Sequence, residues 1–187
     1  MNVRLNFLII HKSLQNYRRG NKMVNGKRKG GKMERDTAKT LSFWMFDDEH
    51  VLKREPTSGA IKHAYCGDVF PMKQIEWSYF PFLIETKTGY EEHTPTLWKY
   101  TKVLEWFNKS IIESKQHNQW IIFLICQFKN QSQLLFTNYQ FDLNKIVPVA
   151  IIPNQLNGEI QWINTYLFKE LIKLNFLDLF NTEIQYR

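Results

Sequence analysis

Cysteine is scarce in this chain of 187 residues, which contains only Cys66 and Cys126. Two separated thiols provide neither a disulfide framework nor a zinc site, which needs closely spaced Cys and His sets. We therefore expect a reducing compartment, and we interpret Cys66 as a small buried side chain rather than a nucleophile.

Long apolar runs are missing as well. No stretch approaches the roughly 20 apolar residues that a helix needs to span a bilayer. The run from Leu5 to Ile10 is too short for the core of a signal peptide. These absences argue against membrane insertion and secretion, and they predict a cytoplasmic protein.

Acidic residues are absent from the first 32 residues, which hold nine Lys and Arg, whereas the remaining 155 residues hold 16 basic and 18 acidic residues. The net charge of +7 therefore belongs to this arm. A basic arm adds salt-dependent attraction to nucleic-acid phosphates, with Lys27, Arg28 and Lys29 as candidate contacts. The alternative is a solubilising tail. We interpret residues 1–32 as a flexible arm whose first 22 residues contribute little to the fold.

The remaining chain has the composition of a globular protein, with 43% apolar and 15% aromatic residues. Its length predicts one domain, residues 33–187, in which residues 138–187 are an addition of unassigned role. Apolar spacing predicts helices over 33–46, 96–116 and 165–179, and strands over 50–54, 61–70, 80–87, 120–128, 133–137, 146–152 and 159–163. This order predicts an α/β fold with a mixed central sheet flanked by helices.

Two of the predicted strands carry residues suited to phosphodiester hydrolysis. Asp68 lies in the strand over 61–70, and Glu85 and Lys87 end the strand over 80–87. Because side chains alternate along a strand, Glu85 and Lys87 point to one face and Thr86 to the other. Mg²⁺ prefers carboxylate and carbonyl oxygens, so Asp68, Glu85 and the Thr86 carbonyl are candidate ligands. Lys87 can then stabilise charge or relay a proton beside the attacking water.

A Glu-x-Lys triplet is more often a solvated pair on an exposed strand. Two features favour the catalytic interpretation here. The triplet follows the apolar run from Phe80 to Ile84, and a second acid in a Gly-Asp context precedes it at the distance of a neighbouring strand.

The order of several motifs between about residues 25 and 137 resembles the PD-(D/E)xK nuclease superfamily, in particular its phage-encoded group that is described as Holliday junction resolvase-like. The similar segments are 30–35 with 41–44, 54–60, 67–69, 80–87, 104–107 and 121–128. They correspond to an opening helix with its acid, an Arg-x-x-x-Ser-Gly segment, the first metal acid, the second motif with its Phe-Pro-Phe lead-in, a helix with a tryptophan, and the strand that follows.

The resemblance implies a restriction-endonuclease-like core and a Mg²⁺-dependent DNA endonuclease, with Mn²⁺ as a substitute. It implies that Glu34 is an accessory acid at the metal, and that Arg54 and Ser58 contact phosphate. It also implies branched DNA as substrate, a homodimer, and the host-cell cytoplasm as the place of action. One departure is Lys109, which stands near the position where the family commonly has a glutamine on the helix.

Alternatives to this interpretation remain open. Glu34 can be an ordinary surface residue, and the segment 56–59 can be a plain turn. His63, His93 and His117 can be general bases or ordinary polar residues. Most tryptophans are expected in the core, including Trp120 at the start of a buried strand. The rival functions are a nucleic-acid-binding protein that does not cut, and an interaction protein that docks through residues 138–187.

Overall fold

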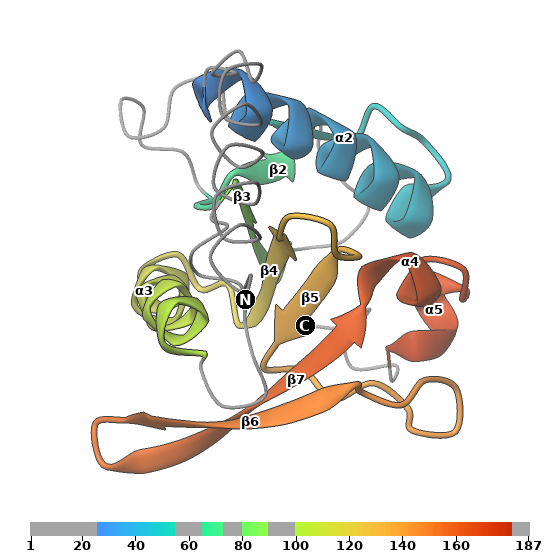
Figure 1. The fold of residues 1–187 in the computed structure, drawn as a ribbon. Coiled ribbons are helices and arrows are strands. Elements are labelled where there is room, and N and C mark those ends of the chain that lie inside the picture. Colours follow the sequence, from blue (N-terminus) through green and yellow to red (C-terminus); the bar gives the residue numbers. More distant parts are fainter. Residues whose placement is uncertain (1–25, 55–64, 73–79, 90–99, 181–187) are drawn as a thin grey trace, which may run out of the picture.

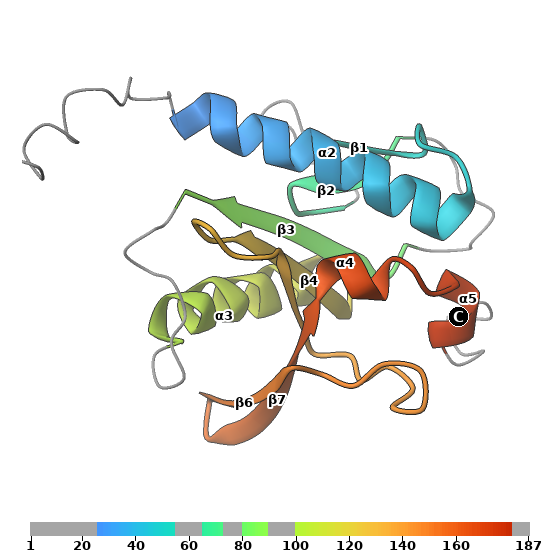
Figure 2. The same cartoon turned by 45° about the vertical axis from the view of Figure 1, so that its right-hand side comes forward.

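A seven-stranded sheet with helices on both faces forms the body of the protein (Figures 1 and 2), as seen in a computed structural model that describes residues 26–54, 65–72, 80–89 and 100–180. The helices are α2 (Gly26–Phe46), α3 (Thr101–Gln116), α4 (Phe168–Leu171) and α5 (Phe176–Leu179). The strands are β1 (Leu52–Arg54), β2 (Val69–Pro71), β3 (Phe82–Thr88), β4 (Ile121–Gln127), β5 (Leu134–Thr137), β6 (Ala150–Leu156) and β7 (Glu159–Leu167).

The sheet is mixed, with the strand order β1-β2-β3-β4-β5-β7-β6. Only β3 and β4 pair in parallel, and α3 connects them, as a parallel pair requires. The other neighbours are antiparallel. This arrangement confirms the predicted α/β, restriction-endonuclease-like fold class.

Each face of the central strands belongs to a different core. Phe82 and Ile84 of β3 face the core under α2, together with Phe123 and Ile125 of β4. The alternate residues of β4 face a second core that α3 covers through Val103, Phe107 and Ile111. Figure 2 shows the sheet lying between α2 above and α3 below. The continuous apolar run that predicted a central strand is therefore explained, because β4 is buried on both sides.

The C-terminal part of the domain completes the core under α2. Phe141, Tyr166 and Phe168 are buried in it, and so are side chains of both short terminal helices. The indole Nε1 of Trp44 on α2 donates a hydrogen bond to the Leu174 carbonyl (2.8 Å), and its ring meets Phe176 edge-on. Residues 138–180 thus hold the first helix in place.

Helix α2 begins at Gly26, seven residues before the predicted start, so residues 26–32 of the expected flexible arm are helical. Gly30 and Gly31 weaken a helix on propensity alone. Tertiary contacts compensate, because Met33 is buried and Gly31 lies directly beneath the guanidinium of Arg54. The division into an arm over 1–32 and a domain over 33–187 stays a prediction.

Four of the seven strands lie within two residues of their predicted bounds, and β7 extends four residues beyond its predicted end, but three other predictions were wrong. The strand expected over 61–70 is only Val69–Pro71 in the described residues, so Asp68 precedes it. The strand expected over 146–152 is β6, four residues later. The helix expected over 165–179 is replaced by the end of β7 and two short helices, because Asn175 caps a new helix with its side chain on Leu177 N (2.9 Å).

Two burial predictions were also wrong. Ile112, expected on the buried stripe of α3, is 56% exposed, because the sheet meets the helix through Ser110 and Ser114 instead. Trp120 is 38% exposed, since it precedes β4 at the end of the sheet rather than inside it.

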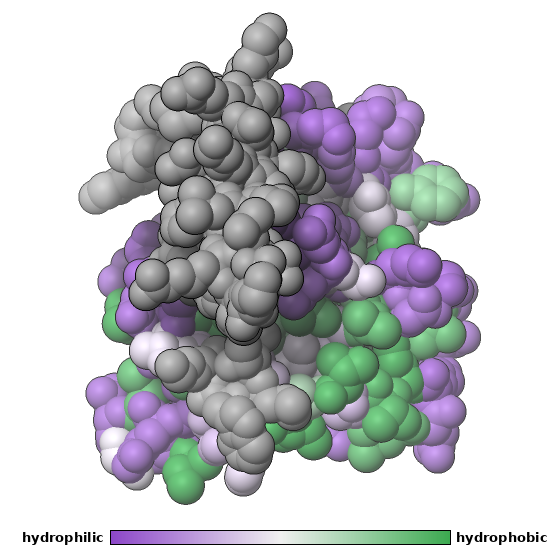
Figure 3. Space-filling view, in the orientation of Figure 1, coloured by the Kyte–Doolittle hydropathy of each residue, from purple (hydrophilic) through white to green (hydrophobic). Residues whose placement is uncertain are grey.

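The β6–β7 hairpin has one buried and one exposed apolar face. Ile152 and Ile163 pack beneath α3, whereas Ile151, Ile160 and Trp162 are exposed. Figure 3 shows that hydrophobic atoms also gather on the surface where α5 and the loop before β6 lie. Within the described ranges, no helix combines the length and apolarity needed to cross a membrane.

Candidate active site

Asp68 reaches the edge of β3 through a close approach of two backbones. Gly67 has φ +107°, and a Cβ on it would lie 2.7 Å from the Ile84 carbonyl oxygen. The next amide, Asp68 N, donates to that same oxygen at 2.8 Å. Only glycine fits both the backbone angle and the space, so the Gly-Asp order is a steric requirement.

The Asp68 carboxylate replaces a strand partner at this edge. Its Oδ2 accepts hydrogen bonds from the backbone N of Thr86 (2.8 Å) and from the Thr86 hydroxyl (3.2 Å). The N–H and C=O of one strand residue point to the same edge. The Thr86 carbonyl therefore faces the edge occupied by Asp68, as a ligand to a shared cation would require.

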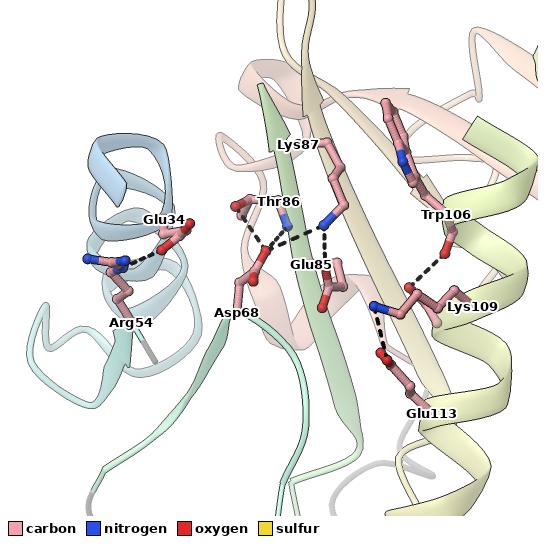
Figure 4. Close-up of polar contacts among 10 residues, drawn as sticks. Glu34, Arg54, Asp68, Glu85, Thr86, Lys87, Trp106, Lys109 and Glu113 are labelled. Atoms are coloured by element: carbon pink, nitrogen blue, oxygen red, sulfur yellow. Dashed lines mark hydrogen bonds and ion pairs between the residues drawn. The ribbon is translucent and has the colours of Figure 1, made fainter. Parts of the chain in front are cut away.

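Glu85 and Lys87 lie on the opposite face from the Thr86 side chain, as their alternation predicts. They pair with Leu124 and Cys126 of β4, which face the core covered by α3. The Lys87 ammonium lies 2.5 Å from Glu85 Oε2 and 3.9 Å from Asp68 Oδ2 (Figure 4). The structure thus brings together three of the four predicted catalytic residues, with the Lys87 ammonium in contact with the carboxyl groups of both Asp68 and Glu85.

The electrostatics of the cluster are unfavourable for two ionised carboxylates. The pKa of Glu85 is raised from its ordinary value of 4.5 to about 7, first by burial and then by the nearby Asp68 charge, with Lys87 acting in the opposite direction. A divalent cation would relieve both the burial and the repulsion.

Glu34 and Arg54 form a separate ion pair at the neighbouring end of the sheet. Arg54 Nε donates to Glu34 Oε2, and both side chains are partly buried. Figure 4 shows this pair between α2 and β1, on the far side of Asp68 from Lys87. The structure gives Glu34 a basic partner, and no contact joins it to the carboxylates or ammonium of the cluster in the described part of the chain.

An acid that the sequence analysis did not select, Glu113, lies on the face of α3 that turns toward the cluster. Its charge raises the pKa values of both Glu85 and Cys66, and it pairs with Lys109 at 3.3 Å (Figure 4). The helical spacing of Lys109 and Glu113 predicts their pairing. Only the packing of α3 against β3 shows that they lie near the site.

Several candidate residues cannot be placed. Ser58, His63 and His93 lie outside the described residues, and so do the side chains of Lys27 and Arg28. Lys29 is exposed on the first turn of α2, and His117 follows the last turn of α3.

The oxygen atoms at the site suit a hard divalent cation, of whose ligands the protein would supply only a part. Asp68 and Glu85 supply carboxylate oxygens, and Thr86 supplies a carbonyl, a set that Mg²⁺ accepts when water and substrate phosphate complete it. Over 26–54, 65–72, 80–89 and 100–180, no three His, Cys, Asp or Glu side chains form a metal cluster on their own.

Comparison with known proteins gives one match. The model of a family described as "phage putative PDDEXK endonuclease" matches residues 25–184, which is most of the chain. No curated protein and no solved structure matches.

We predict that Gly67→Ala severely impairs both stability and divalent-cation binding. The new Cβ combines a left-handed backbone, which costs roughly 1–2 kcal/mol, with a steric conflict at Ile84. Gly158→Ala is the matched control, because Gly158 has φ +85° but open space around its Cβ. Chemical denaturation and Mn²⁺ titration of both variants check this. Equal losses in the two variants would contradict it.

We predict that stability without metal falls as the pH rises from about 4.5 to about 7. The pKa of Glu85 is raised in the folded state, so the folded protein binds this proton more tightly than the unfolded chain, and that contribution disappears as the proton leaves. The loss is on the order of 3 kcal/mol. Glu85→Gln should flatten the profile measured by denaturation in EDTA, whereas Glu159→Gln, at an exposed position, should leave it unchanged.

Proposed function

This chain belongs to the phage PD-(D/E)xK endonuclease family, and on that premise we propose that it is a Mg²⁺-dependent endonuclease that hydrolyses phosphodiester bonds of DNA. The observation that carries the proposal is the position of the Lys87 ammonium between the Asp68 and Glu85 carboxylates. Two acids held this close at a sheet edge are costly in a protein that does not bind a cation there.

In the proposed reaction the acids bind the cation and the lysine acts on the reacting groups. Asp68 and Glu85, with the Thr86 carbonyl, hold the cation against a substrate phosphate. Lys87 stabilises the charge that develops on the phosphate or relays the proton of the attacking water. When bound, the cation lowers the pKa of its water and neutralises the phosphoryl oxygens. Mn²⁺ would substitute because it accepts the same oxygen ligands.

Arg54 is the proposed phosphate-binding residue beside this cluster. Its pairing with Glu34 uses Nε, which leaves the terminal nitrogens of the guanidinium to contact a phosphate. Glu34 would then orient Arg54 and, as the family resemblance implies, assist at the metal. Ser58 and the basic residues Lys27, Arg28 and Lys29 would extend the contact along the DNA backbone.

Branched DNA, such as a four-way junction, is the proposed substrate, and the host-cell cytoplasm is the proposed place of action. Both rest on the resemblance to the resolvase-like group. The second candidate is a nucleic-acid-binding protein of the same fold that does not cut. Retention of Asp68, Glu85 and Lys87 in one contacting cluster favours cleavage.

We predict that Asp68→Asn and Lys87→Gln each lower cleavage by at least about 100-fold, because each removes a charge needed at the reacting phosphate. Both substitutions nearly keep the side-chain volume, and the amide oxygen introduced by Asp68→Asn can still accept from the Thr86 backbone N–H. The fold and the DNA affinity should therefore persist. Cleavage is measured with Mg²⁺ or Mn²⁺ on four-way junctions, flaps, linear duplex and single strands.

Lys173→Ala, which removes an exposed lysine paired with Glu170 just after α4, is the control and should cut like wild type. Wild-type activity in Asp68→Asn would refute the assignment. A wild-type protein that binds DNA but neither binds Mn²⁺ in calorimetry nor cuts would establish the non-cleaving alternative.

A homodimer is the proposed working form, so that two sites can act on two strands. The exposed face of the β6–β7 hairpin supports this proposal, because Ile160 and Trp162 are exposed there and residues 147–164 contain one charged residue, Glu159. A surface with so few charges is poorly suited to bind DNA, because DNA binding depends on basic side chains that neutralise phosphates. Specific dimers commonly bury about 800 Å² on each partner, which apolar faces of this kind help to supply.

Sedimentation of the wild-type protein should therefore give a dimer, and Ile160→Glu should give a monomer that remains folded, because the new charge would be buried against the partner. Lys129→Glu, an exposed change elsewhere on the surface, serves as the control. A wild-type protein that sediments as a monomer at all concentrations would contradict the dimer.

A further inference from the structure

A single buried amide fixes the backbone segment that delivers Asp68. Gln119 lies in the connection between α3 and β4 and is 1% exposed. Its Oε1 accepts hydrogen bonds from Cys66 N (2.8 Å) and Cys66 Sγ (3.1 Å). Its Nε2 donates to the carbonyls of Cys66 (3.3 Å) and Phe82. Gln119 therefore occupies both backbone groups of Cys66, as a neighbouring strand would.

The thiol takes part in this arrangement as a donor. The Cys66 sulfur lies 3.1 Å from the Gln119 side-chain oxygen, to which its S–H donates. The amide oxygen of Gln119 thus accepts two hydrogen bonds from Cys66, and its nitrogen donates to two carbonyls. These partners fix the orientation of the amide.

Apart from Gln119, the segment is held at its start by Tyr65, whose ring meets Phe80 edge-on, and at its end by the contacts of Asp68. Residues 65–68 form no strand, and Gly67 has a backbone angle open mainly to glycine. In the described residues, the hydrogen bonds to Cys66 come from Gln119, and Asp68 is held by Ile84, Thr86 and Lys87. Without Gln119, Cys66 would lose the hydrogen bonds that connect it to β3 at Phe82 and to the end of α3.

Gln119 itself is held firmly. Its backbone N donates to the Ser114 carbonyl at 2.9 Å, across Asn118 in the left-handed conformation (φ 56°), which closes the end of α3. The amide thus connects three parts of the site: the end of α3, the start of β3 at Phe82, and the Asp68 segment.

We propose that Gln119 is a positioning residue of the active site, which acts through the Cys66 backbone to set the place of the Asp68 carboxylate relative to Glu85. The inference rests on the proposed function and names a residue that takes no part in the chemistry. Groups that orient metal ligands from behind commonly change metal affinity or activity by roughly 10- to 100-fold when removed.

A purely structural role would lower stability alone, and Asn138 provides the control for it. Asn138 also clamps the start of β4 with its amide, accepting from Ile122 N (2.9 Å) and donating to the Trp120 carbonyl (2.8 Å). Neither of these bonds involves Cys66 or β3. Removing the Asn138 amide should lower the stability of the protein without moving Asp68.

The experiment compares Gln119→Met and Asn138→Leu in the full-length protein. The readouts are the melting temperature, the dissociation constant for Mn²⁺ alone, and kcat and KM for DNA. We expect Gln119→Met to weaken Mn²⁺ binding and lower kcat at least about 10-fold with KM for DNA unchanged. Asn138→Leu should lower the melting temperature while Mn²⁺ affinity and kcat stay within about twofold of wild type.

Gln119→Glu is the second variant in case Gln119→Met does not fold. It keeps the volume and the oxygen that accepts from Cys66 N but removes the Nε2 donor, so a loss of Mn²⁺ affinity and kcat is again expected. Wild-type affinity and kcat in a folded Gln119 variant, or equal losses in Asn138→Leu, would overturn the inference. A wild-type protein that neither binds Mn²⁺ nor cuts DNA would instead overturn the proposed function on which it rests.

Discussion

The docking of Asp68 against the edge of β3 is the contact on which the active site depends. The Thr86 amide, which a neighbouring strand would otherwise bind, donates to the Asp68 carboxylate instead. That exchange is possible only because Gly67 brings its backbone against Ile84, where a side chain would collide. The strand β2 pairs with β3 at one position, Val69 with Ile84, so the edge beyond that pair is left for the carboxylate.

The same contact brings the Asp68 carboxylate close to that of Glu85, and the other residues of the site affect the repulsion between the two. Asp68 lies beside Glu85, which is partly buried on the face of β3 that α3 covers and therefore ionises less readily. Lys87 offsets part of the repulsion by contacting both acids, and Glu113 adds to it from α3. A site with more negative than positive charge in a low-dielectric position is suited to a divalent cation.

The C-terminal part of the chain contributes to this site from a distance. The end of β7 and the helices α4 and α5 pack under α2 through Tyr166, Phe168 and Phe176, and the Trp44 hydrogen bond to Leu174 locks that packing. Helix α2 in turn holds Glu34 against Arg54. Residues 138–180 thus contribute to the domain core, while the outer face of the β6–β7 hairpin is exposed.

The sequence alone determined the parts of the protein that depend on local periodicity. The apolar run of β4 identified a central strand, and the alternation in β3 put Glu85 and Lys87 on one face, because both patterns follow from backbone geometry. Tertiary structure decided the rest. The bond from Thr86 to Asp68 spans 18 residues and that from Cys66 to Gln119 spans 53, and no local pattern connects them. Glycine at position 67 and the role of Gln119 are intelligible only after β3 and the end of α3 are in place, since each satisfies a steric or hydrogen-bonding requirement that the folded chain creates.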